Sequence, residues 1–352
     1  RRSTGTIPAR QQELTSMDMK KSILLFLAGV VVFSSCAKKV STSPNEDAKM
    51  LFDAWMKVNH PDLQPTPLGA YILENTPGRG VMIDENCAFV RVMYSNGTLD
   101  GTISATNREE LAKQLGKYNE TYDYGPQFWS MEALYAGVAE SVRNMRVGGR
   151  IKLIVPGWLM SAKRYDTQEE YLKNVTGTNT IYDIDIVEGV WDVNKWQIDS
   201  LSRYVESHCG ISSADSVKLG YYYISESVQP ESTKFESDTT IYINYTGRLL
   251  NGKVFDTTIK DTAVCYGIYS SGKSYKPVSV SVKVEDYTQT SFTSSGSTLI
   301  DGFSYTLSQM KSLEKGSGIF IAHLGYGASG SGNVIAPYAP LRFDIEIVEG
   351  ED

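Results

Sequence analysis

The sequence contains one pattern of motifs twice. Each copy opens on Leu-Gly-x-Tyr, continues without a gap to Leu-Asp-Gly or Leu-Asn-Gly, and ends on eight similar residues. Self-similarity of this kind indicates repeated structural units. We therefore predict a duplicated unit of about 120 to 135 residues. The matching segments are 68–71 with 219–222, 99–101 with 250–252, Tyr94 with Tyr245, and 182–189 with 343–350.

Both copies are predicted to combine strands with one short helix. Apolar residues recur at every second position in 241–246 and 341–347, which is the period of a strand with one buried face. Between these segments, apolar residues follow helical spacing. One sheet with a helix on its inner face is an α+β arrangement, and we expect it in each copy. The helical positions are Phe303, Leu307 and Met310 in the second copy, and Leu134, Val138, Val142 and Met145 in the first.

A helical segment precedes each copy. Leu51, Trp55 and Val58 share one helical face before the first, with Asn45 or Asp47 as the expected N-cap. Before the second copy, the shared face is formed by Ile198, Leu201 and Val205. A linker helix packed on its neighbouring domain and a dimerisation helix are both compatible with this pattern, and the linker helix is favoured. The expected divisions are 1–36 (upstream residues and signal peptide), 37–64 (tether and short helix), 65–190 (first domain), 191–216 (linker helix) and 217–352 (second domain).

The N-terminal segment is typical of a secretory signal. Lys20 and Lys21 precede the apolar run 23–33, which is too short to span a bilayer and ends in Ser-Ser before Cys36. This junction resembles the lipobox of bacterial lipoproteins, and the resemblance implies that Cys36 carries a lipid. The chain would then be anchored to a membrane of the bacterial cell envelope, facing the periplasm. The alternative is a plain signal peptide in which this cysteine is incidental.

Charge and cysteine content exclude several classes of function. The 34 basic and 41 acidic side chains give a net charge of −7, which argues against a nucleic-acid binder. Cys87, Cys209 and Cys265 are odd in number and far apart, so buried free thiols are expected rather than disulfides. The three histidines have no metal-ligand spacing. We therefore expect no metal and no cofactor.

Several ordered motifs in the second copy resemble one enzyme family. Residues 243–258 (INYTGRLLNGKVFDTT), 299–303 (LIDGF), 325–330 (GYGASG) and 334–344 (VIAPYAPLRFD) are similar to the signature motifs of FKBP-type peptidyl-prolyl cis-trans isomerases, in the family order. The resemblance covers about 130 residues. It implies two FKBP-like domains, each an antiparallel β-sheet wrapped around a short helix, and an isomerase site in the second only.

The resemblance also implies the site residues. An X-Pro amide rotates slowly because resonance gives its C–N bond partial double-bond character, so a dry aromatic pocket with a few donors suffices to favour the twisted state. Phe303 would form the pocket floor, Tyr326 would donate its hydroxyl to a substrate carbonyl, and Asp256 would polarise the site. The expected catalytic residues are Tyr245, Phe255, Asp256 and Tyr326, and the expected substrate-binding residues are Leu299, Ile300, Phe303, Ile335 and Phe343.

The second copy departs from the family pattern at three positions. Phe303 replaces a Trp, Ala336 replaces a Pro, and Asp261 stands where the family has an Arg that pairs with the catalytic Asp. That pairing is either lost or supplied elsewhere. Residues 259–298 are longer than in compact members and are predicted to form an inserted hairpin beside the pocket. The string 325–330 also matches G-x-G-x-x-G, but the following Gly and Pro residues exclude the helix that a dinucleotide site needs.

The first copy lacks most of the implied site. Ser104 and Ala105 stand at the Phe-Asp positions, Val138 stands at the aromatic floor, and the Tyr-Gly loop is missing. We therefore expect a degenerate, non-catalytic domain. For the whole chain, the leading hypothesis is a prolyl isomerase that assists the folding of exported, proline-containing polypeptides. The alternative is a non-catalytic chaperone or adaptor lipoprotein whose FKBP-like modules only bind polypeptide.

Overall fold

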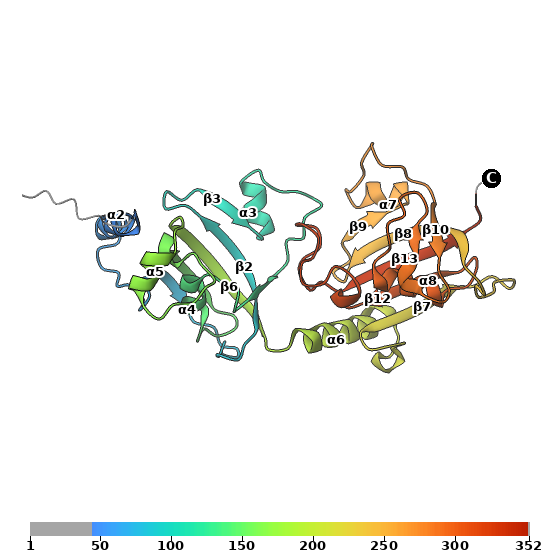
Figure 1. Ribbon diagram of the computed structural model, residues 1–352, viewed down its shortest axis with the longest axis horizontal. Coiled ribbons are helices and arrows are strands. Elements are labelled where there is room, and N and C mark those ends of the chain that lie inside the picture. Colours follow the sequence, from blue (N-terminus) through green and yellow to red (C-terminus); the bar gives the residue numbers. More distant parts are fainter. Residues whose placement is uncertain (1–43, 351–352) are drawn as a thin grey trace, which may run out of the picture. The chain divides into compact units, whose positions relative to one another are not determined.

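The computed structural model describes residues 44–350. Its α+β class, with two separate antiparallel sheets and short helices, confirms the predicted fold class (Figure 1). Helix α2 (Pro44–Asn59) precedes both sheets in the chain. The apolar face predicted for α2 is wrong, because Leu51 and Val58 are 68% and 80% exposed whereas Phe52 and Met56 are buried. The helix also begins before Asn45, so neither predicted N-cap residue holds that position.

The sheet of the first repeat has six strands in the order β1-β5-β6-β2-β3, and β4 pairs with β2. All its pairings are antiparallel. The elements of this repeat are β1 (Tyr71–Thr76), β2 (Phe89–Gly97), β3 (Ile103–Thr106), α3 (Glu109–Gln114), β4 (Gln127–Ser130), α4 (Ala136–Val142), β5 (Arg150–Val155), the 3₁₀ turn η1 (Gly157–Leu159), α5 (Gln168–Asn174) and β6 (Thr180–Val190).

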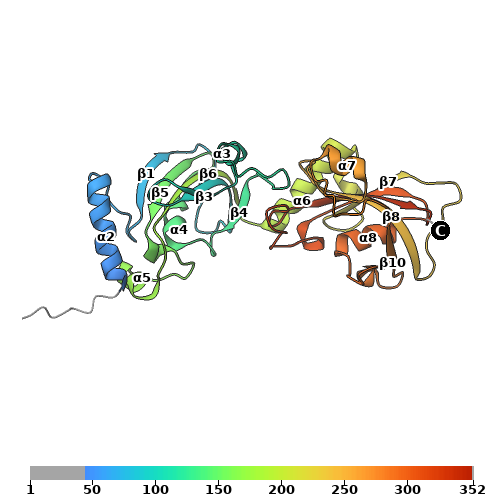
Figure 2. The same ribbon diagram turned by 90° about the horizontal axis from the view of Figure 1, so that it is seen from above.

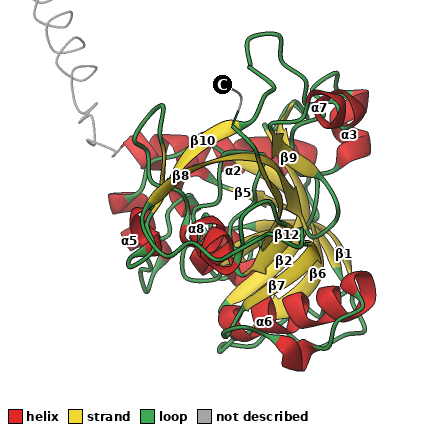
Figure 3. Cartoon of the chain, turned by 90° about the vertical axis from the view of Figure 1, so that its right-hand side faces the viewer, coloured by secondary structure: helices red, strands yellow, loops and turns green. Residues whose placement is uncertain are grey.

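The sheet of the second repeat has seven strands in the order β11-β10-β8-β13-β12-β7, and β9 pairs with β8. Figure 3 distinguishes its strands and helices from the loops that connect them. The elements are β7 (Tyr221–Ser227), β8 (Thr239–Leu249), β9 (Val254–Thr257), α7 (Lys260–Cys265), β10 (Val278–Val282), η4 (Tyr287–Gln289), β11 (Ser291–Phe292), α8 (Asp301–Gln309), β12 (Lys315–Phe320), η5 (Ala322–Leu324) and β13 (Leu341–Val348).

The two sheets have the same strand order, which confirms the duplication. The strand order β7-β12-β13-β8-β9 of the second sheet matches the order β1-β5-β6-β2-β3 of the first. In addition, β10 pairs with β8 in the second sheet, as β4 pairs with β2 in the first. Residue numbers differ by a constant 151 from β2 through α3 (Tyr94 and Tyr245, Ile103 and Val254, Glu109 and Lys260). The difference rises to 165 at β5 and β12 (Arg150 and Lys315). Extra residues of the second repeat therefore lie between α7 and α8.

Segment 259–298 is only partly the inserted hairpin that the sequence predicts. Its β10 and β11 do pair in antiparallel fashion, with Val280 opposite Phe292. Its first part, however, is helix α7, which has a counterpart in α3 at the same offset of 151 (Lys260 and Glu109). Helix α7 therefore belongs to the repeated scaffold, and so does β10, which is the counterpart of β4. The prediction missed α7 because a six-residue helix is too short to show a helical period.

Helix α8 packs on the inner face of the second sheet and carries the centre of its core. It contacts β12, β7 and β10, and Figure 2 shows it beside β10. Phe303 and Leu307 are buried there together with Tyr245 of β8 and Phe343 of β13. In the first repeat α4 contacts β5 in the same way, with Val138 and Val142 buried. The helical spacing noted in the sequence therefore marks the helix that fills each sheet.

Helix α6 (Val193–Tyr204), which continues into the π-helical turn η2 (Val205–Cys209), packs on the second repeat. Leu201 and Val205 are fully buried against Tyr222 and Ile319. These are two of the three residues that the sequence places on one face. The side chain of Asp192 caps the first turn by accepting a hydrogen bond from the Lys195 N–H. The short 3₁₀ turn η3 (Ser213–Asp215) leads from α6 to β7.

The described cysteines are all free thiols, as expected, but they are not all buried. Cys87 is buried, Cys209 is half-buried and Cys265 is exposed at the end of α7. The prediction of three buried thiols is therefore wrong for Cys265. Cys36 and the rest of the predicted signal lie outside the described residues. Within residues 44–350, no helix combines the length and apolarity that crossing a membrane requires.

Candidate active site

An aromatic cluster fills the inner face of the second sheet. Tyr245 on β8, Phe303 on α8 and Phe343 on β13 are all at most 9% exposed. The Phe303 ring lies 4.8 Å from the Phe343 ring and 5.4 Å from the Tyr245 ring, both in T-shaped contacts. Edge-to-face packing of this kind suits aromatic quadrupoles and fixes the rings in place. Three of the predicted site residues therefore form one contiguous apolar wall.

Phe255 extends this wall from the neighbouring strand. Its ring lies 5.5 Å from that of Phe343, and it is half-buried. The position of the ring depends on Gly247, because a Cβ at that glycine would lie 2.6 Å from Phe255 and 2.9 Å from Phe343. Strand β8 thus carries a glycine where the Phe255 ring crosses its backbone. Close approach of a ring to a strand is a common reason for glycine within a sheet.

Asp256 lies at the edge of the cluster and is held by two side chains. The Tyr245 hydroxyl donates to its Oδ2 at 2.6 Å, and the ammonium group of Lys273 pairs with its Oδ1. Lys273 therefore pairs with this carboxylate in place of the arginine that the family has at the position of Asp261. No motif in the sequence indicated this lysine. It lies 17 residues beyond Asp256 in a loop without regular structure, where no pattern relates it to the carboxylate.

Tyr326 lies in the loop after η5 and is 36% exposed. Burial and the negative charge of Asp256 both raise the pKa of its phenol, so the hydroxyl stays protonated at neutral pH. Within residues 44–350, this hydroxyl forms no hydrogen bond. Gly327 and Gly330 both adopt positive φ, at 59° and 63°, and no helix begins before β13. The loop is therefore not a dinucleotide site, as the sequence indicates.

The remaining predicted residues also belong to this region. Leu299 and Ile335 are buried in the same core cluster as Phe303, and Ile300 packs against it. Burial raises the pKa of the Tyr245 phenol strongly, and the adjacent Asp256 raises it further. A protonated Tyr245 can keep donating to the carboxylate. The structure thus brings eight of the nine predicted residues into one cluster or its edge, and Tyr326 lies within electrostatic reach of Asp256.

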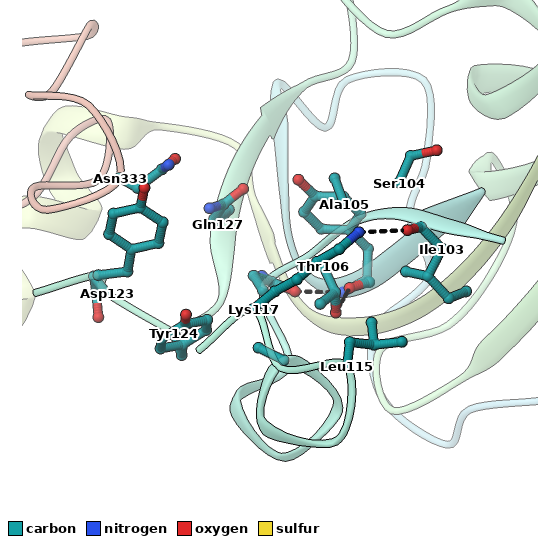
Figure 4. Close-up of a pocket in the computed structure, with 14 residues that line it drawn as sticks. Ile103, Ser104, Ala105, Thr106, Leu115, Lys117, Asp123, Tyr124, Gln127 and Asn333 are labelled. Carbon is teal, nitrogen blue, oxygen red and sulfur yellow. Dashed lines mark hydrogen bonds between the residues drawn. The ribbon is translucent and has the colours of Figure 1, made fainter. Parts of the chain in front are cut away.

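The first repeat has a polar cavity where its counterparts of Phe255 and Asp256 stand. Ser104 and Ala105 on β3 line a cavity of about 220 Å³, which also borders Tyr94, α3 and the segment around Tyr124. Figure 4 shows Lys117 reaching across it to donate to the Ile103 carbonyl at 2.9 Å. Asn333 of the second repeat also lines it, and its carbonyl accepts from the Asp123 N–H at 2.7 Å. Ser104 and Ala105 are smaller than Phe255 and Asp256, so space remains beside them. The first repeat therefore has no carboxylate at the position of Asp256.

Comparisons with known proteins agree with this assignment of the second repeat. The model of the family described as FKBP-type peptidyl-prolyl cis-trans isomerase matches residues 231–348. The macrophage infectivity potentiator of Trypanosoma cruzi is 29% identical over 141 residues, which are 39% of this chain and 58% of that protein. The chain thus spans less than two thirds of the length of this relative.

Two solved structures are similar over larger parts of the chain. The three FKBP domains of wheat FKBP73 share 14% identity at a TM-score of 0.27, covering 79% of this chain and 93% of that one. FkpA from Escherichia coli shares 12% identity at a TM-score of 0.28, covering 53% and 75%. At TM-scores this low, neither likeness bears on the arrangement of the chain. The family match and the aromatic cluster coincide in the same residues, so the second repeat is similar to FKBP-type peptidyl-prolyl cis-trans isomerases both in sequence and in the residues of its candidate site.

Proposed function

We propose that the second repeat catalyses cis–trans isomerisation of X-Pro bonds and that the first repeat does not. The observation that carries the proposal is the aromatic cluster with Asp256 fixed at its edge by Tyr245 and Lys273. The family match over residues 231–348 supports the same chemistry. The first repeat has Ala105 where the second has Asp256, in the same register against its central strand.

The reaction needs no covalent intermediate. The planar amide is stabilised by charge separation along O–C–N, and the rotation barrier is about 18–20 kcal/mol. Binding of a proline ring against Phe303, Phe255 and Phe343 would remove the adjoining amide from water. This loss of hydration disfavours the charge-separated planar form. The Tyr326 hydroxyl would donate to a substrate carbonyl outside the twisting amide, where the hydrogen bond positions the peptide without stabilising the planar form.

Asp256 contributes a fixed negative charge beside the twisting bond. Its carboxylate accepts from Tyr245 and pairs with Lys273, so it does not need to reorient during the reaction. Preorganised charge of this kind acts without a reorganisation cost at the moment of reaction. We propose this electrostatic role for Asp256, with Tyr245 and Lys273 as the groups that position it.

A protease-coupled assay on a Leu-Pro peptide with the full chain tests the assignment. The chain should accelerate isomerisation, and combined Phe255→Ala and Asp256→Ala substitutions should remove at least 90% of the acceleration, or about 1.4 kcal/mol of transition-state stabilisation. Ser104→Ala in the first repeat is the matched control and should change nothing. Full activity in the double variant would locate the site elsewhere, and no acceleration by the native chain would favour a binding module.

For the cellular role, we propose that the chain is lipid-anchored through Cys36 and assists exported polypeptides at the periplasmic side of a bacterial membrane. Uncatalysed X-Pro isomerisation takes tens of seconds or longer and can limit folding, which gives such an enzyme a task. Mass spectrometry of the mature N-terminus tests the anchor. A diacylglycerol-sized mass increase should be present in the native protein and absent after Cys36→Ala.

A further inference from the structure

A second cavity in the first repeat is larger and more apolar than the one beside Ser104. It measures about 330 Å³, at the lower end of the range for small-ligand pockets. Of its ten lining residues none is charged. Its walls come from β2, β4, β6 and the segment that leads into α4: Tyr94, Asn96, Phe128, Trp129, Ser130, Ala133, Leu134, Tyr135, Val138 and Tyr182.

The cavity occupies the place in the repeat that the aromatic cluster occupies in the second. Tyr94 corresponds to Tyr245, and Tyr182 corresponds to Phe343 in the aligned C-terminal segments. Both line the cavity. The helix floor is Val138, at the position of Phe303, and it is buried. A smaller floor deepens the space between helix and sheet.

The large aromatic side chain stands on the sheet in the first repeat and on the helix in the second. Trp129 stands opposite Val90 in the β2–β4 pair, and the corresponding residue in the β8–β10 pair is Val280, opposite Ile241. The Trp129 ring lies 4.8 Å from Tyr94 and 6.4 Å from Tyr182. The first repeat therefore has Trp on the strand and Val on the helix, whereas the second has Val on the strand and Phe on the helix. The exchange keeps an aromatic wall around an open cavity.

The polar atoms of the cavity are neutral. Burial raises the pKa of the Tyr94 phenol and raises that of Tyr182 to about 12, so both stay protonated. Phenol and amide groups can donate to and accept from a polypeptide backbone, and the lining has no fixed charge to bind an ion. Proline-containing segments dock on aromatic-lined sites because their extended form is already ordered before binding.

We propose that this cavity is a second, non-catalytic binding site that takes the proline ring of an uncharged, extended polypeptide segment against Trp129, Tyr94 and Tyr182. It has no counterpart of Asp256, so it holds a segment without lowering the rotation barrier. The binding claim does not require the second repeat to be catalytic.

Fluorescence polarisation on the full chain tests the site. The probe is a labelled neutral peptide with a central Leu-Pro pair, and the matched peptide has Ala in place of Pro. Measurements use the background with Phe255→Ala and Asp256→Ala, so that the proposed isomerase site of the second repeat is impaired. Trp129→Ala should weaken binding by about tenfold, which is typical for loss of an aromatic anchor. The matched peptide should bind several-fold more weakly than the probe.

Ala133→Arg is the second variant, because Ala133 lines the cavity and is exposed, so an added charge blocks entry without disturbing the core. Glu132→Arg introduces the same side chain one residue away, at an exposed position outside the lining, and should leave binding unchanged. Loss of binding in Ala133→Arg but not in Glu132→Arg supports the site, even if Trp129→Ala fails to fold. Unchanged binding in Ala133→Arg, equal affinity for the two peptides, or no binding in the background would overturn the proposal. Isomerase activity is measured separately in the native background and is expected to be the same in Ala133→Arg.

Discussion

The two repeats share one topology but place their large aromatic side chains differently. In the second, Phe303 on the helix, Phe255 on β9 and Phe343 on β13 contact one another. In the first, the helix and β3 carry Val138 and Ser104, and Trp129 on β4 provides the large ring. Exchanges that roughly keep total volume are tolerated in cores, whereas a lost carboxylate has no packing equivalent. The difference shows that one topology accommodates two different sets of side chains at the same place in the sheet.

The largest effect is expected at Gly247, which only the second repeat requires. Gly247→Ala would push the Phe255 and Phe343 rings apart, since its Cβ would lie 2.6 Å and 2.9 Å from them. We expect isomerase activity to fall about 100-fold and the free energy of unfolding to drop by about 1–3 kcal/mol. In the first repeat Asn96 holds the position that corresponds to Gly247, so Asn96→Ala should leave isomerase activity unchanged. Both variants are measured by isomerase activity and by urea unfolding. Native activity in Gly247→Ala would contradict the placement of Phe255.

A smaller loss is expected at Tyr326, in a loop that the first repeat lacks. Tyr326→Phe keeps the ring and removes the hydroxyl. Activity should fall about fivefold, the rate equivalent of one hydrogen bond of about 1 kcal/mol. The loss should appear as a raised KM with little change in kcat, because this bond holds planar and twisted peptide alike. Unchanged kcat and KM would exclude Tyr326 as the donor.

Lys273 should matter less, because its ion pair with Asp256 is partly open to water. The two side chains are 37% and 39% exposed, and exposed pairs contribute about 0–1 kcal/mol. We expect Lys273→Ala to reduce activity about twofold to threefold, and Lys273→Arg to restore most of it. Raising the salt concentration should narrow the gap between native and Lys273→Ala. A gap that persists in high salt would mean that Lys273 acts by packing.

The smallest effect at neutral pH concerns Tyr182, whose counterpart Phe343 cannot titrate. Burial raises the Tyr182 pKa from 10.0 to about 12, so burial favours the protonated form. A raised pKa adds stability that is fully present below pH 10 and is lost as the pH rises through about 12. Tyr182→Phe should therefore flatten part of the decline in unfolding free energy over this window. Chemical denaturation from pH 8 to 11.5 measures it, and identical slopes for both proteins would contradict it.

The fold was largely predictable from periodicity and repetition. The alternation at 241–246 and 341–347 marks strands with one buried face, and both lie in the observed central pair β8 and β13. Helix α7 was not predicted because it is short, and the face of α2 was misjudged because Leu51 and Phe52 are equally apolar neighbours. Periodicity locates elements well but does not choose between adjacent apolar residues.

The candidate site was predictable only where local motifs carry it. Phe255 and Asp256 are adjacent in one motif, so their identification needed no long-range contact. Two residues were not predicted because tertiary structure alone brings them to their sites. Lys273 reaches Asp256 through the conformation of a loop, 17 residues further along the chain. Trp129 lies beside Tyr94 because of the register between two adjacent strands. A sequence pattern alone does not bring such pairs together.

The shared topology also creates a risk of misassembly during synthesis. Two neighbouring units with the same strand order can exchange equivalent strands, a known failure of repeated domains. One ion pair opposes such an exchange. In the native pairing Arg91 stands opposite Glu188 and forms an ion pair with it. If β8 replaced β2 beside β6, Tyr242 would stand opposite Glu188, and this carboxylate would lose its partner. Divergence between the repeats at this one position thus favours the native partner of β6.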